Sequence, residues 1–338
     1  MPREQRPEWP NGLVKETDMG WSGKGPWKYT LLSEPQLSAE ASRVANGYAK
    51  GLLHTVTFQP NQAPSNRIGN QDRYVVEDWE ITGQVWKFRA VFDGHANGNE
   101  TVDHTYEGLP IKLRERLLAT LKNNHAPPPE TISTVLSSVI TDFDNDIEED
   151  LQTLFPSPEY VEGLTDEEIQ KIINDGGPNY TTVARCMRGT TVVIVLLSPT
   201  AEDIWVATLG DSQAVLGVKS NSGEWVSKVL SFNHNGNQAS EVEIIKKQHP
   251  GEDKVVTEGR VLGLIAVTRA PVRIYTSRIF RNAYSGLRPG SEEMVAKLLE
   301  RNITPPYLSN VPDVSHLKLK KDDISKGTTP SSFPDGHT

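Results

Sequence analysis

The stretch Val85-Trp86-Lys87-Phe88-Arg89-Ala90-Val91-Phe92-Asp93-Gly94-His95 decides the fold and points to the site. Its first part is an apolar run with the character of a β-strand, and the run ends at Asp93-Gly94-His95. A carboxylate, a backbone carbonyl and an imidazole therefore follow one another at a strand end. Such a place can hold hard cations through oxygen ligands with a proton donor beside them. Alone, an Asp-Gly pair after a strand is more often a turn, so the interpretation depends on the accompanying motifs.

The elements on either side of this stretch come in groups. Strands are predicted over 73–81 and 84–92, joined by a short hairpin loop at Thr82-Gly83. Apolar residues at helical spacing predict helices over 109–124 and 131–154. Residues 157–178 are predicted to be loop-like, with one short helix after Thr165 that begins with a Thr-x-x-Glu capping box. Further strands are predicted at 189–197, 203–209, 213–218, 225–230, 261 and 316–320, and further helices at 238–248 and 291–302.

The N-terminal part differs in composition. Residues 1–60 are predicted to form an extension with one helix. Ser33 caps this helix, Pro35 lies near its start, and the helix runs through 39–49. Beyond it, strands stand before and after paired helices. This grouping favours an α+β fold over a repeating βαβ unit.

Composition excludes several classes of protein. The chain has 338 residues, 36% of them hydrophobic and 23% charged, which indicates a globular protein with a sizeable core. The formal net charge is −9 without any marked run of Lys or Arg, so nucleic acid and membrane surfaces are not expected as partners. The single cysteine, Cys186, excludes an internal disulfide framework and suits a reducing compartment.

The sequence shows no targeting or membrane-spanning pattern. The longest apolar run, 190–197, has the length of a strand. The first ten residues lack the apolar core of a signal peptide, and their early glutamates do not fit a transit peptide. These features predict a cytoplasmic or nuclear protein.

Five stretches carry chemically distinctive residues in one order along the chain. They are Arg67 with Asn70-Gln71-Asp72-Arg73, Phe92-Asp93-Gly94-His95, Gly189-Thr190-Thr191, Gly210-Asp211-Ser212, and the segment from Gly259 to Ala270. Their order and approximate spacing resemble the metal-dependent protein phosphatases (PPM, protein phosphatase 2C-type). The resemblance covers about residues 65–323. It is nearest the pyruvate dehydrogenase phosphatase-like branch, through Thr304-Pro305-Pro306-Tyr307-Leu308.

The resemblance implies an architecture. It implies a four-layer α-β-β-α sandwich, in which a central pair of largely antiparallel sheets is flanked by helices. The phosphatase domain is expected over 61–323, followed by an unstructured tail over 324–338. The resemblance also implies two Mn²⁺ or Mg²⁺ ions, a phosphoprotein substrate and a monomeric state. Within this fold the Gly189-Thr190-Thr191 stretch is interpreted as a determinant of structure.

The resemblance also implies roles for individual residues. Asp93 would bridge both cations, and the Gly94 carbonyl would bind one of them. Gln71 stands at a further ligand position, and Asp72 would orient metal-bound water. Asp211 matches a carboxylate near an additional, weaker metal ion.

Two residues are implied to act on the substrate. Arg67 would hold the phosphate through its planar fork of donors. His95 would be the general acid that protonates the departing serine or threonine oxygen. The other histidines show no ligand spacing and are interpreted as structural or solvated.

The chain departs from the family pattern at three places. Gln71 stands where the family usually has glutamate, and Arg269-Ala270 runs into Pro271 instead of an apolar residue, Gly and Asp. After Asp323 the sequence lacks the apolar strand and Asp-Gly pair that supply further metal ligands in the family; Asp335-Gly336 lacks a strand before it and is interpreted as a chance match. With fewer anionic ligands, weaker cation binding is expected.

Three functional hypotheses follow. The first is a metal-dependent serine/threonine phosphatase. The second is a catalytically impaired pseudophosphatase that binds phosphoproteins through Arg67. The third is a truncated, non-functional product. The resemblance favours the first hypothesis, and the other two are the alternatives to it.

Overall fold

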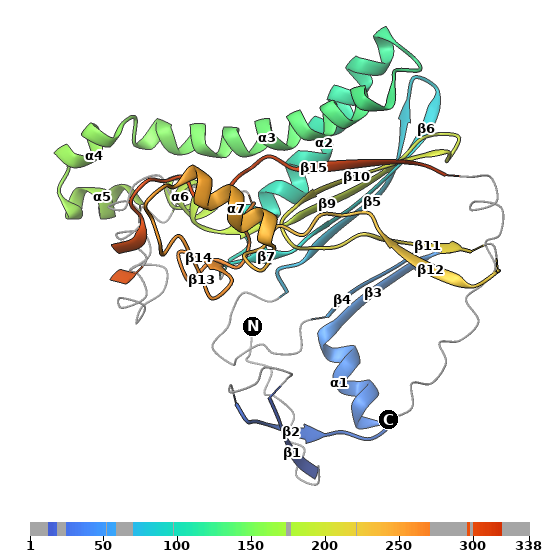
Figure 1. Cartoon of the computed structure of the whole chain (residues 1–338), viewed down its shortest axis with the longest axis horizontal. Helices are drawn as coiled ribbons and strands as arrows, with labels where there is room; N and C mark the ends of the chain where they lie inside the picture. The colour runs from blue at the N-terminus through green and yellow to red at the C-terminus, as the bar shows by residue number, and fades with distance from the viewer. Residues whose placement is uncertain are drawn as a thin grey trace. The chain divides into compact units, whose positions relative to one another are not determined.

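The computed structural model describes residues 13–18, 25–51, 53–58, 70–96, 98–173, 177–220, 222–270, 296–297 and 300–319 (Figure 1). The chain forms two compact units, residues 1–70 and 71–338, and each is described by itself. Three predictions lie outside the described residues: the role of Arg67, most of the helix at 291–302, and the tail at 324–338. The predicted domain boundary at residue 61 stays a prediction.

The first unit contains two hairpins and one helix. β1 (Leu13–Thr17) pairs antiparallel with β2 (Trp27–Leu31), and β3 (Ala45–Lys50) pairs antiparallel with β4 (Leu53–Phe58). Between the hairpins, α1 spans Gln36–Val44. The prediction of a helix through residue 49 is therefore wrong at its C-terminal end. Asn46 and Gly47 are poor helix formers, and this segment exchanges backbone hydrogen bonds with β4 instead.

A five-stranded antiparallel sheet is the centre of the second unit. Its strand order is β15-β10-β9-β6-β5, and every neighbouring pair is antiparallel. The strands are β5 (Arg73–Ile81), β6 (Gln84–Phe92), β9 (Val192–Leu197), β10 (Asp203–Leu209) and β15 (Asp313–Lys318). The bounds of β5 and β6 agree with the prediction. Thr82 and Gly83 between them both have positive φ, 50° and 76°, as a tight two-residue hairpin turn requires.

Alternation of side chains explains the β5–β6 hairpin. Trp79, Ile81, Phe88 and Phe92 are all at most 1% exposed, while the alternate residues Glu80, Arg89 and Val91 are more exposed. Trp79 stacks on Phe88 with a centroid separation of 4.1 Å. The buried face of each strand therefore contributes large rings to one continuous core.

Two long helices pack along the sheet (Figure 1). They are α2 (Glu100–Asn123) and α3 (Pro129–Leu154). α2 begins nine residues before the predicted 109 and continues through Pro110, where a proline normally breaks a helix. Val102, Leu109 and Leu113 are fully buried along this helix. Their packing outweighs the backbone hydrogen bond that Pro110 cannot donate.

The segment 157–178, predicted as a loop with one helix, contains two helices, and a third begins at its last residue. They are α4 (Pro158–Gly163), α5 (Asp166–Ile173) and α6 (Pro178–Met187). The capping box of α5 is confirmed, since the Thr165 amide donates to Glu168 Oε2 at 2.7 Å and the Glu168 amide donates to Thr165 Oγ1 at 3.2 Å. α4 and α6 each begin with a proline, which is tolerated in the first helical turn.

The remaining elements are short. They are β7 (Gly94–His95) paired with β8 (Gly189–Thr190), β11 (Val215–Lys219) with β12 (Trp225–Val229), β13 (Val256–Thr257) with β14 (Arg260–Val261), and helix α7 (Ala239–Gln248). The strand predicted over 189–197 is thus interrupted at Thr191. The described residues show a mixed α/β fold with antiparallel sheets, and the four-layer sandwich stays a prediction. No helix among the described residues is long and apolar enough to cross a membrane.

Candidate metal centre

Asp93 lies at the junction between β6 and β7. Its backbone N–H donates to Thr191 Oγ1 at 3.2 Å, and the Thr191 N–H donates to the Asp93 carbonyl at 2.9 Å. Thr191 lies in the corresponding break between β8 and β9. The reciprocal bonds therefore fix the Asp93 backbone at the point where one pair of strands gives way to another.

Three carboxylates converge at this junction. The pKa of Asp93 is raised to about 6 because burial disfavours its charged form, because Asp72 and Asp211 are negatively charged nearby, and because Asp72 hydrogen bonds to its side chain. Asp72 precedes β5 and Asp211 follows β10, so three distant segments meet here. The result is a local excess of negative charge.

The donor set fits hard divalent cations, which prefer carboxylate and carbonyl oxygens. Within the ranges that the structure describes, however, there is no group of three or more His, Cys, Asp or Glu side chains arranged to hold a metal ion. Asp72, Asp93 and Asp211 thus influence one another electrostatically without forming a closed ligand shell. Their chemistry suits a cation site in which water and backbone carbonyls complete the coordination.

Arg73 supports the Asp72 end of the site. Its Nη1 donates to the Asp72 carbonyl at 2.9 Å, while its Nε and Nη2 lie 2.8 and 2.7 Å from Asp103 Oδ1. Asp103 belongs to the first turn of α2. Arg73 therefore ties the start of β5 to the start of α2.

Gln71 and Gly94 approach each other through their backbones. A Cβ atom at position 94 would lie 2.7 Å from the Gln71 carbonyl oxygen and 2.8 Å from Val102 Cγ1, so only glycine fits. The Gln71 side-chain Nε2 donates to the Gly98 carbonyl at 2.7 Å. The amide of Gln71 thus holds the loop after His95, a contact that sequence reasoning did not predict.

His95 lies beside the carboxylates on β7. Its Nδ1 is 3.4 Å from the Asp93 carbonyl oxygen. Burial lowers the pKa of His95, and this effect is opposed by the hydrogen bond to Asp93 and by the charge of Asp211. The protein surroundings therefore favour a neutral imidazole more than solution does.

Arg188 supports the same loop and was not predicted to do so. Its guanidinium occupies the space beside Gly98, where any Cβ would collide with Nη1, and it forms an ion pair with Glu100. Its position directly before Gly189-Thr190-Thr191 is the one signal that the sequence offered. Arg188 is 8% exposed, so its role is to hold the loop rather than to meet substrate.

Asp211 lies in a turn that Thr191 also contacts. Gly210, before it, has φ of +108°, and a Cβ there would lie 2.7 Å from Thr191 Cγ2. Thr191 Oγ1 is 2.6 Å from Ser212 Oγ. Thr191 therefore links the Asp93 junction to the Asp211 turn.

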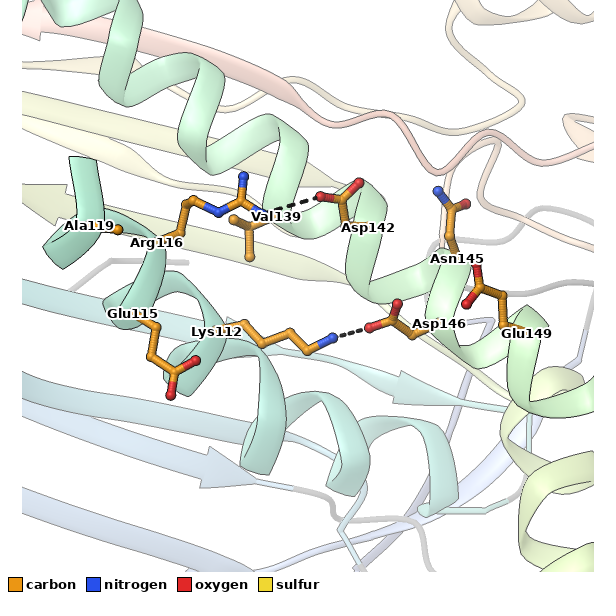
Figure 2. Close-up of a pocket in the computed structure, with 9 residues that line it drawn as sticks. All are labelled: Lys112, Glu115, Arg116, Ala119, Val139, Asp142, Asn145, Asp146 and Glu149. Carbon is orange, nitrogen blue, oxygen red and sulfur yellow. Dashed lines mark hydrogen bonds and ion pairs between the residues drawn. The ribbon is translucent and has the colours of Figure 1, made fainter.

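A separate cavity of about 510 Å³ lies between α2 and α3 (Figure 2). Lys112 and Arg116 of α2 pair with Asp146 and Asp142 of α3, and the second pair has an N–O distance of 3.9 Å. The cavity is lined by Lys112, Glu115, Arg116, Ala119, Val139, Asp142, Asn145, Asp146 and Glu149. None of them is a predicted site residue, so the cavity is distinct from the carboxylate cluster.

Comparison with known proteins gives one family and several relatives. Residues 135–324 match the family model described as Protein phosphatase 2C. The mitochondrial [pyruvate dehydrogenase [acetyl-transferring]]-phosphatase 1 of Saccharomyces cerevisiae is 28% identical over 329 residues, which are 92% of this chain and 54% of that protein. The protein of the same name from Bos taurus is 32% identical over 152 residues, 43% of this chain and 28% of that protein. A crystal structure of serine-threonine phosphatase 2C from Toxoplasma gondii aligns at 15% identity over 76% of this chain and 72% of that one, with a TM-score of 0.43.

The relatives bear on how much of a longer protein this chain covers and on its location in the cell. The chain spans about half the length of the yeast relative, 54%. The yeast and bovine relatives are both named as mitochondrial. The expectation of a cytoplasmic or nuclear location is therefore wrong, and the composition of the first ten residues was not a valid guide to it.

Proposed function

Because this chain belongs to the protein phosphatase 2C family, we propose that it is a metal-dependent protein serine/threonine phosphatase. The observation that carries the proposal is the convergence of Asp72, Asp93 and Asp211, which raises the pKa of Asp93 to about 6. A fold that gathers like charges needs a counter-charge. Divalent cations supply it and act on phosphate esters.

The residues present suit Mn²⁺ or Mg²⁺. Asp93 and the Gly94 carbonyl would hold the cations, with Asp72 orienting bound water and Asp211 serving an additional ion. When bound, the cations supply Lewis-acid activation of water and neutralise charge on the phosphoryl group. The Gln71 amide nitrogen donates to the Gly98 carbonyl, so its side-chain oxygen is the atom that would serve as a ligand.

Two side chains would act on the phosphoprotein. Arg67, which lies outside the described residues, would hold the phosphate. His95 would donate a proton to the departing serine or threonine oxygen. With hydrogen on Nδ1 directed to the Asp93 carbonyl, its Nε2 is left to carry the transferred proton. Burial lowers the pKa of His95, whereas the negative charge of Asp211 raises it and so helps the imidazole to acquire that proton.

The relatives narrow the substrate. Both are named for pyruvate dehydrogenase and for mitochondria. We propose a phosphorylated mitochondrial dehydrogenase subunit as substrate and a monomeric enzyme, with no role for nucleic acid or membrane binding. Fractionation of cells that express the tagged full-length protein tests the location.

Hydrolysis of a phosphothreonine peptide tests the activity. Turnover should require Mn²⁺, disappear with chelator, and fall at least about 100-fold in Asp93→Asn, because losing even a supporting residue of a metal site costs 10- to 100-fold. The matched control is Asp142→Asn, an exposed carboxylate of α3, which should behave as wild type. Undiminished turnover in Asp93→Asn would contradict the proposal. Phosphopeptide binding without turnover in any metal would favour the pseudophosphatase instead.

A further inference from the structure

A fully buried histidine lies behind the Asp211 turn. His234 is 1% exposed. The Gly210 N–H donates to His234 Nδ1 at 3.2 Å, and the backbone N–H of His234 donates to the Gly210 carbonyl at 3.0 Å. Both polar groups of Gly210 are thus bound by one residue, directly before Asp211. We infer that His234 is a positioning residue that sets the place of the Asp211 carboxylate in the metal centre.

The contacts of His234 determine its tautomer. Nδ1 accepts a hydrogen bond from a backbone amide, so it carries no hydrogen. The hydrogen is therefore on Nε2, which lies 2.9 Å from Asp313 Oδ2 and donates to it. A hydrogen on Nδ1 would face the Gly210 N–H, so the contacts fit the tautomer that carries its hydrogen on Nε2.

The turn needs this acceptor. β10 ends at Leu209, and Gly210 turns away with φ of +108° against the side chain of Thr191. Its buried N–H has left the strand ladder and would be costly without a partner. His234 replaces the lost ladder bond, so the direction in which Asp211 leaves the strand depends on His234.

A charged network holds His234 in turn. Asp313 Oδ2 also lies 3.1 Å from Arg269 Nη1, and Arg269 donates to both oxygens of Glu241, at 2.6 and 2.9 Å. Thr268 Oγ1 donates to Glu241 at 2.6 Å, and the Thr268 N–H donates to the His234 carbonyl at 2.9 Å. The network around His234 therefore includes residues of α7, of β15 and of the 268–269 segment.

The inference rests on the proposed function, because it assigns His234 to the same metal centre. If His234 were only structural, losing the Nδ1 contact and losing the Nε2 contact would have similar effects on stability. A positioning histidine should act through Nδ1 and Gly210, and only where Asp211 is present. Two substitutions separate these roles.

The matched pair is His234→Asn and His234→Gln. The Asn oxygen can take the place of Nδ1 and accept from Gly210, while the Gln amide can take the place of Nε2 and reach Asp313 but leaves Gly210 without an acceptor. The Mn²⁺ concentration for half-maximal turnover should rise about 10-fold or more in His234→Gln. It should stay within about threefold of wild type in His234→Asn. In an Asp211→Asn background, His234→Gln should add nothing.

Mn²⁺ binding measured by electron paramagnetic resonance gives a readout without turnover. If wild type binds Mn²⁺ but hydrolyses nothing, the proposed function fails while the positioning role is still tested by the same comparison. If His234→Gln does not fold, ¹⁵N spectra of the wild-type imidazole at neutral pH decide, and they should show hydrogen on Nε2 alone. Equal effects of the two substitutions, additivity with Asp211→Asn, or hydrogen on Nδ1 would each overturn the inference.

Discussion

The carboxylate of Asp93 makes the cation-free protein sensitive to pH. Its pKa rises to about 6 through burial and through the charges of Asp72 and Asp211. The folded state therefore binds this proton more tightly than the unfolded state does, whose carboxyl has the ordinary value of 3.8. The resulting stabilisation is fully present below pH 3.8 and is lost as the pH rises through 6.

Replacing Asp93 by Asn should stabilise the protein in chelator. At pH 7.5 the substitution removes a charge that its neighbours repel, so the melting temperature should rise by a few degrees. The gain should shrink as the pH falls toward 4, where wild-type Asp93 is protonated as well. Calorimetry between pH 4 and 8 measures it, with Asp142→Asn as control. A lower melting temperature for Asp93→Asn at pH 7.5 would show that the carboxylates do not repel one another.

Some residues of the candidate site could be predicted from the sequence and others could not. Asp72, Asp93 and Asp211 were selected through the resemblance, and their mutual charge effects place them near one another. His234 was interpreted only as structural or solvated, and Arg188 received no part in the site. Their importance depends on what their side chains touch 24 and 90 residues away, at Gly210 and Gly98, and no local spacing contains that information.

At the scale of elements, the ion pair between Arg269 and Glu241 joins a loop to α7. Both side chains are largely buried, with 14% and 8% exposed. Burial alone would raise the pKa of Glu241, yet hydrogen bonds from Arg269 and Thr268 lower it below its ordinary value. The pair is therefore charged, and its stabilising effect is present at neutral pH and is lost as the pH falls through the lowered pKa.

Breaking this pair should be costly. Arg269→Met leaves Glu241 buried without its partner and should lower the free energy of unfolding by about 3–5 kcal/mol. The double variant Arg269→Met/Glu241→Leu should recover part of that loss, because no uncompensated charge remains. Denaturant unfolding gives both values, with exposed Lys246→Met of α7 as control. A loss below about 1 kcal/mol for Arg269→Met would mean that solvent reaches the pair.

Elements were predictable where one face is buried. The alternating β5 and β6 followed directly from the pattern, as did the α5 capping box, because these signals are local. The end of α1, the start of α2, and helices α4 and α6 were not predicted. In α2 the burial of Val102 overrides the local effect of Pro110, and burial is decided by parts of the fold that a window of sequence does not include.

At the scale of the whole molecule, the candidate metal centre is assembled within one unit. Every contact described for Asp93, Asp211 and His234 joins residues of the second unit, 71–338. The order of the motifs was visible in the sequence. The sequence did not show that β15, from the far end of the described chain, pairs with β10 and supplies Asp313 as the partner of His234. Antiparallel pairing over more than 100 residues leaves no local trace.

Residues 71–338 expressed alone should keep this centre. We expect cooperative thermal unfolding and Mn²⁺ affinity close to that of the full chain, because the five-stranded sheet and its core lie in this unit. Hydrolysis should weaken, since Arg67 is removed. Calorimetry and Mn²⁺ titration of both chains make the comparison. Loss of cooperative unfolding on removing residues 1–70 would show that the first unit is needed for the fold.

The position of Thr191 limits how related sequences can change. Its backbone N–H donates to the Asp93 carbonyl, and its hydroxyl accepts from the Asp93 N–H and contacts Ser212 Oγ. Its methyl lies where a side chain at Gly210 would stand. A larger or apolar residue there would disturb two distant motifs in one step. Among homologues, positions 191, 210 and 212 should therefore vary together or not at all, and the linked changes should arise through intermediates of low fitness. The break in the strand at Thr191 therefore predicts evolutionary epistasis among these three positions.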